Sequence, residues 1–189
     1  MEDEISRALH FGTRGGGRDY WHWKDRPESE LSAAETVLES AGLKVAQLTS
    51  RPRGDDPPDC EGFIDGKKCG IEVTELVHQE ALRASIREGA PEVHFAWEQV
   101  DLLNFLQERI DRKDDSSKLK GGPYDLYILV IHTDELFLDR ATVERFLTGS
   151  LFSAHLITHA YLGLSYDPQI RACPVFALPI APRQKPSPG

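Results

Sequence analysis

The dipeptide Asp65-Gly66 lies between two runs of strand-forming residues, and it constrains the fold of this chain more than any other feature. Asp-Gly between such runs is among the strongest signals for a two-residue type I′ hairpin turn. The turn would pair Ile64 with Lys67. Counting outward in the same register, Asp59 falls opposite Glu72. Opposed side chains share a face of the sheet, with Cβ atoms about 4.5–5.5 Å apart, so these two carboxylates need either solvent to screen them or a cation to bind them.

A wider turn that includes both lysines gives a second possible register. It would place Asp59 opposite Thr74 and Glu72 opposite Glu61, and the acidic side chains would still share a face. Two carboxylates with nearby main-chain carbonyls form a hard-oxygen site suited to Mg²⁺ or Mn²⁺. The alternative is a solvated acidic face beside a surface turn. Glu61 and Glu75 are expected to be surface charges.

The length of 189 residues suits one domain, and the 40% hydrophobic and 28% charged fractions are ordinary for a soluble globular protein. No apolar run approaches the ~20 residues that a membrane span needs. The acidic N-terminus has no apolar signal-peptide core behind it. We therefore expect a cytoplasmic protein with no membrane association. Of the three cysteines, Cys60 and Cys69 lie close enough in the hairpin to bridge, but reduced thiols are expected.

The formal net charge of −9 bears on the class of partner. It counts against a protein whose whole surface grips nucleic acid through phosphate neutralisation. A local basic strip around an acidic metal centre remains compatible with it.

Hydrophobic periodicity and turn residues predict a mixed sheet with helices on its faces. The chain divides into a flexible arm (1–29), one domain (30–180) and a disordered tail (181–189). Outside the hairpin, the predicted elements are a helix at 31–41, a strand at 44–49, helices at 78–88 and 93–113, a buried strand at 124–132, a helix at 139–147 and strands at 157–166 and 173–180.

Pro58-Asp59, the hairpin and Glu72-Val73-Thr74 together resemble the PD-(D/E)XK nuclease superfamily. The core of that family is a helix followed by a three-stranded meander, a helix and a further strand. The resemblance covers roughly residues 31–132. It implies a restriction-endonuclease-like α/β fold, in which a mixed β-sheet is flanked by helices around an αβββα(α)β core.

The resemblance also implies roles for individual residues. Asp59 and Glu72 would be metal ligands for Mg²⁺ or Mn²⁺, assisted by the main-chain carbonyl of Val73. Glu35, on the preceding helix, would be the additional acidic residue. The implied activity is hydrolysis of phosphodiester bonds, most often in DNA, so a nucleic acid is the expected partner. Many small nucleases of this type act as homodimers.

One departure from the family pattern puts catalysis in question. The family's lysine falls at Thr74, and threonine cannot supply a cation to attacking water or to developing phosphate charge. Lys113 is the candidate replacement, because it ends the inward face of the long helix; Lys118 and Lys120, in the loop that follows, are weaker candidates. The alternative for Lys113 is a snorkelling side chain that complements the helix dipole.

Two other functions remain open from the sequence. The first is a nuclease-like domain that has lost catalysis and acts as a binding or assembly module. The threonine at the lysine position and the net charge of −9 motivate it. The second is a small α/β interaction protein in which the motif arose by chance.

Overall fold

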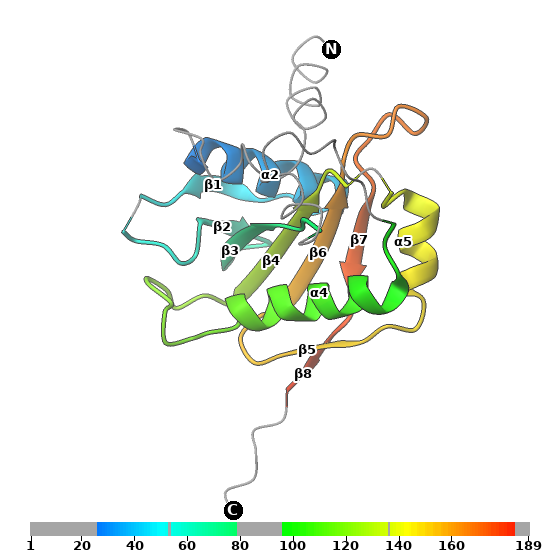
Figure 1. The fold of residues 1–189 in the computed structure, drawn as a ribbon. Helices are drawn as coiled ribbons and strands as arrows, with labels where there is room; N and C mark the ends of the chain where they lie inside the picture. The colour runs from blue at the N-terminus through cyan, green and yellow to red at the C-terminus, as the bar shows by residue number, and fades with distance from the viewer. Residues whose placement is uncertain (1–25, 53, 79–95, 136, 184–189) are drawn as a thin grey trace, which may run out of the picture.

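The computed structural model describes residues 26–52, 54–78, 96–135 and 137–183, and within them helices cover both faces of a mixed sheet (Figure 1). No helix in these ranges combines the length and apolarity needed to cross a bilayer. The described helices are α2 Arg26–Ser40, α4 Gln99–Lys113 and α5 Arg140–Leu147. The described strands are β1 Ala46–Ser50, β2 Cys60–Ile64, β3 Lys67–Glu75, β4 Leu126–Thr133, β5 Phe152–Ala154, β6 His159–Leu164, β7 Val175–Leu178 and β8 Ile180–Pro182.

The main sheet has the order β1-β2-β3-β4-β6-β7. β1, β2 and β3 form an antiparallel meander, β4 and β6 continue parallel to β3, and β7 closes the sheet antiparallel to β6. β5 and β8 form a separate parallel pair beneath α4 (Figure 1). The expected mixed α/β architecture is confirmed.

Alternation along β3 and β4 divides the apolar core into two layers. On one face, Ile71 and Val73 pack with Ile128 and Val130 against α2. On the other face, apolar residues of β4 pack against α4 and α5. Because Glu72 lies between Ile71 and Val73, its side chain points to the face covered by α4.

The hairpin has the predicted two-residue turn. Both of its central residues have positive φ, 50° at Asp65 and 78° at Gly66, as a type I′ turn requires. Ile64 pairs with Lys67 and Cys60 pairs with Ile71, so the wider turn is wrong. One step beyond the last pair, Asp59 falls opposite Glu72.

The cysteines are unbridged, as expected. Cys60, Cys69 and Cys173 are all free and buried. Cys60 aligns with Ile71 and Cys69 with Gly62, so the two hairpin cysteines are not opposed in the ladder.

One helix and one strand extend past the predicted ends of the domain. α2 begins at Arg26, so the last four residues of the expected flexible arm are helical; Pro27 and Glu28 favour a first helical turn. At the other end, Ala181 and Pro182 belong to β8 and pair with β5, so the tail expected to be disordered from 181 is ordered at its start. Strands of three residues are too short to give a readable alternation in sequence.

The predicted helices around residue 90 are tested only in part. α4 starts at Gln99, preceded by Glu98 in an extended conformation. The segment 79–95, which contains most of the expected helix at 78–88, lies outside the described residues, as do residues 1–25 of the arm.

Candidate functional site

The two hairpin carboxylates lie together on the α4 face of the sheet and are almost fully buried. Their side chains are 3% exposed for Asp59 and 1% exposed for Glu72. The backbone N–H of Val73 donates to Asp59 Oδ2 at 2.8 Å, and the Tyr127 hydroxyl donates to Glu72 Oε1 at 2.8 Å. Each carboxylate is therefore held in place by a donor from a central strand.

Lys113, the last residue of α4, contacts both carboxylates. Its Nζ donates to Glu72 Oε2 and lies 3.6 Å from Asp59 Oδ2. The helix faces the sheet through Leu106 and Ile110, both fully buried as expected for its inward face. Lys113 continues that face at the helix end, so its ammonium reaches the point where the two carboxylates converge.

Burial and charge shift the proton affinity of this centre. Burial raises the pKa of Glu72 to about 7, with Asp59 adding to the shift and Lys113 and Tyr127 opposing it. Burial acts to lower the pKa of Lys113, but the neighbouring Glu72 and Asp59 outweigh it and raise that pKa overall. Lys113 is therefore positively charged at neutral pH, while Glu72 titrates close to neutrality.

Tyr127 was not predicted as part of the site. It lies on β4 with its Cα paired to Gly70, one position along the face from Glu72. Burial, with the charge of Glu72, raises the pKa of its hydroxyl, so Tyr127 remains a neutral donor. The available signal was a tyrosine within an otherwise apolar central strand, because a buried hydroxyl requires a hydrogen-bond partner.

Glu30, on α2, also acts on this centre. Its side chain is buried at 5% exposure, and its charge contributes to raising the pKa values of Cys60 and Lys113. Glu35, the predicted residue, is only partly buried. Five residues along a helix correspond to about 140° of rotation, so Glu35 points away from the direction of Glu30.

The weaker lysine candidates engage other groups. Lys118 Nζ pairs with Asp115 at 3.0 Å, and Lys120 Nζ donates to the Gly54 carbonyl at 2.7 Å. Thr74 is buried on the same face of β3 as Glu72, so this position of the strand supplies no cation beside Glu72.

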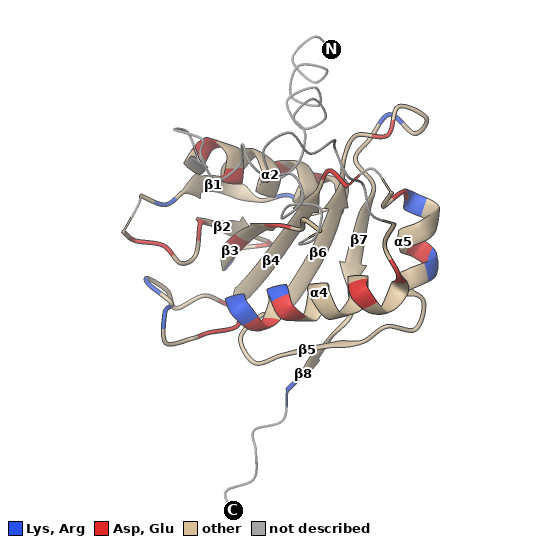
Figure 2. Ribbon diagram, in the orientation of Figure 1, with Lys and Arg blue, Asp and Glu red and all other residues tan. Residues whose placement is uncertain are grey.

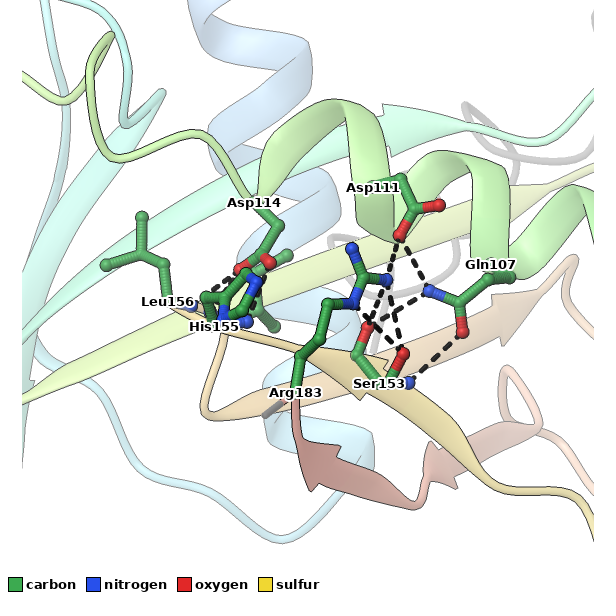
Figure 3. Close-up of polar contacts among 8 residues, drawn as sticks. Gln107, Asp111, Asp114, Ser153, His155, Leu156 and Arg183 are labelled. Carbon is green, nitrogen blue, oxygen red and sulfur yellow. Dashed lines mark hydrogen bonds and ion pairs between the residues drawn. The ribbon is translucent and has the colours of Figure 1, made fainter. Parts of the chain in front are cut away.

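Two contacts fix the C-terminal end of α4, where Lys113 lies (Figure 3). Asp114 accepts hydrogen bonds from the backbone N–H groups of His155, Leu156 and Ile157 at 2.6, 2.6 and 3.0 Å. One turn back, Asp111 forms an ion pair with Arg183, which follows β8. The loop before β6 and the segment after β8 thus fix the position of the C-terminal end of α4.

Asp59 and Glu72 are the donors of this centre that could hold a hard divalent cation. Among the described residues, no group of three or more His, Cys, Asp and Glu side chains is placed to hold a metal ion. Mg²⁺, however, usually binds through one or two carboxylates and keeps several waters. Asp59 and Glu72, with the Val73 carbonyl, would supply such a set.

Charges elsewhere on the chain are mixed. Arg112 and Lys113 lie in the last turn of α4, and acidic and basic residues are interspersed along that helix and α5 (Figure 2). No family model matches the chain, and neither a curated protein nor a solved structure matches it.

Proposed function

We propose that this protein is a metal-dependent nuclease that hydrolyses phosphodiester bonds, with DNA as the expected substrate. The observation that carries the proposal is the position of Lys113. The strand position where the resembling family has its lysine is Thr74, and α4 delivers an ammonium group to the same two carboxylates.

The arrangement of elements supports the PD-(D/E)XK assignment. A helix, an antiparallel three-stranded meander, a further helix and a parallel fourth strand follow in the order that the resemblance implies. Asp59 precedes the second strand of the meander and Glu72 lies in the third, as in the motif.

The chemistry assigns a role to each side chain. Asp59 and Glu72 would hold Mg²⁺ or Mn²⁺, which when bound polarises the scissile phosphate and lowers the pKa of water. Tyr127 orients Glu72 through its Oε1, and Lys113 supplies positive charge beside the reacting phosphate. The burial of the carboxylates strengthens these electrostatic interactions.

A second candidate is a nuclease-like domain without catalysis that serves as a binding or assembly module. The observation favouring it is that Lys113 already compensates Glu72 and Asp59 in a nearly closed site. A buried ion cluster of this kind also occurs as a purely structural feature.

Cleavage assays on plasmid, linear and single-stranded DNA with Mg²⁺ or Mn²⁺ test the proposal. Asp59→Asn and Glu72→Gln should each lower the cleavage rate by about 100-fold or more, because a metal ligand is lost. Glu61→Gln is the matched control, since Glu61 lies in the same hairpin and pairs with Lys68 at 3.4 Å. Cleavage that both site variants retain in full would contradict the proposal. Cation binding by wild type without cleavage would favour the binding module.

A further inference from the structure

We propose that the Lys113 ammonium occupies the position at which the divalent ion binds, so that metal binding displaces Lys113 from Glu72. This inference rests on the proposed function, in which Asp59 and Glu72 hold a metal. It adds that one side chain of this protein sets the affinity for that metal by competing with it.

The first support is the use of the carboxylate oxygens. Tyr127 donates to Glu72 Oε1, and Lys113 donates to Glu72 Oε2 and lies 3.6 Å from Asp59 Oδ2. The ammonium therefore takes the Glu72 oxygen that Tyr127 leaves available. A divalent ion placed where the ammonium lies, between Asp59 and Glu72, would bind that same oxygen.

The second support is the gradient of exposure. The side chains of Asp59 and Glu72 are 3% and 1% exposed, whereas the Lys113 side chain is 26% exposed. Lys113 is thus the member of the three with the greatest contact with solvent, and it can leave the centre without exposing either anchor of the carboxylates.

The third support is that the carboxylates have anchors independent of Lys113. The Val73 N–H holds Asp59, and the Tyr127 hydroxyl holds Glu72. Both anchors come from central strands, while Lys113 reaches in from the end of a helix on a flexible stem. Departure of the ammonium therefore leaves the two carboxylates oriented and available.

With this competition, the apparent metal affinity equals the intrinsic affinity multiplied by the fraction of molecules in which Lys113 is undocked. A docked fraction of about nine-tenths weakens the apparent affinity by about tenfold. The displaced lysine would then be available to the phosphate, so docking and catalysis use the same side chain in two positions.

Calorimetric titration with Mn²⁺ over a pH series tests the inference, with wild type and variants compared at the pH where the affinity of each has reached its plateau, because loss of Lys113 raises the pKa of Glu72 further. Lys113→Met should bind Mn²⁺ at least about tenfold more tightly than wild type, because the competitor is removed. Lys113→Arg keeps the charge and should retain the weaker affinity. Lys118→Met is the matched control, since Lys118 is 67% exposed and pairs with Asp115; it should not change the affinity.

Each outcome bears on one claim. Equal or weaker Mn²⁺ binding by Lys113→Met overturns the competition. Tighter binding by Lys113→Met together with an inactive wild type supports the competition and contradicts the nuclease function. If Lys113→Met is unfolded without metal and Mn²⁺ restores its folding, the result supports the inference. If it fails to fold even with Mn²⁺ while Lys113→Arg folds, Lys113 has a structural role and the inference is overturned.

Discussion

At the residue scale, two opposing effects set the charge state of Glu72: burial favours its protonated form, and two hydrogen-bond donors favour its ionised form. Burial raises its pKa to about 7, and the contacts from Lys113 and Tyr127 oppose that rise. Only the ionised carboxylate binds a metal well. Metal affinity should therefore rise as pH increases through about 7 and fall below it.

Tyr127→Phe should move this pH dependence upward. The variant removes the donor to Glu72 Oε1 and leaves the ring in place, so the ionised form of Glu72 loses one stabilising hydrogen bond. A hydrogen bond to a charged group contributes about 1.5–3 kcal/mol, which corresponds to a shift of about one pH unit or more. Mn²⁺ titrations across a pH series measure it.

Tyr124→Phe provides the control for this prediction. Tyr124 is the neighbouring tyrosine, with ring centroids 6.2 Å apart, but its hydroxyl contacts Glu61 at 3.2 Å instead of Glu72. The midpoint of metal binding should stay near the wild-type value in this variant. A midpoint that Tyr127→Phe also leaves unchanged would show that the hydroxyl does not govern Glu72.

At the scale of the elements, the position of Lys113 depends on how the end of α4 is held. Asp114→Ala removes an acceptor for three backbone N–H groups of the loop before β6 (Figure 3). We expect the free energy of unfolding to fall by about 1–3 kcal/mol, because those donors lose a charged partner. Chemical denaturation measures this loss of stability. The Mn²⁺ affinity of Asp114→Ala should also differ from that of wild type, because α4 carries the competing Lys113.

The next residue along gives the comparison. Asp115 accepts from Ser117 within its own turn and pairs with Lys118. Asp115→Ala should leave the free energy of unfolding close to the wild-type value, as is usual for exposed sites. Equal losses in the two variants would contradict a special role for Asp114.

The hairpin was predictable from the sequence because its determinants are local. The Asp65-Gly66 turn sets the register, and the register alone brings Asp59 opposite Glu72. The end of α4 was partly predictable for the same reason. Helical spacing places Lys113 on the face of Leu106 and Ile110, which is the face that packs on the sheet.

At the scale of the whole molecule, the unpredicted features depend on packing between distant segments. Tyr127 reaches Glu72 only because β4 lies parallel to β3 in one register. Glu30 is buried because α2 begins earlier than its apolar periodicity shows. β5 and β8 are three residues each and form only as a pair across the fold. Single-sequence patterns carry no information about such pairings.

Glu75 is the clearest error at this scale. It was expected on the surface, yet it is 7% exposed, and among the described residues its Oε2 has no hydrogen-bond partner. Burial, with the charges of Asp134 and Glu135, raises the pKa of Glu75 to about 8, against the opposing charge of Arg109. The alternation rule does not predict this burial, because both faces of β3 are covered at that end.

This raised pKa makes the stability of the molecule dependent on pH. The folded state keeps the proton of Glu75 up to a pKa of about 8, whereas the unfolded state releases it near 4.5. The contribution of Glu75 to the free energy of unfolding should therefore fall as pH rises between these values, and Glu72 contributes in the same direction up to about 7. His132 opposes them below about 6.5, because burial lowers its pKa to about 4. Glu75→Gln removes the Glu75 contribution, so the stability of this variant should decline less over this window than that of wild type, by a few kcal/mol, on the order expected for the shift.

Urea denaturation at several pH values between about 5 and 8 measures both slopes. Glu144→Gln is the control, because Glu144 is an exposed carboxylate on α5 paired with Arg140, and its slope should match wild type. If Glu75→Gln loses stability in parallel with wild type, Glu75 is not the protonated buried group. If the stability of Glu75→Gln instead falls further below wild type as pH rises, ionised Glu75 has a stabilising partner in the native fold. The flattened slope is expected because a neutral amide avoids the cost of placing a third negative charge beside Asp134 and Glu135.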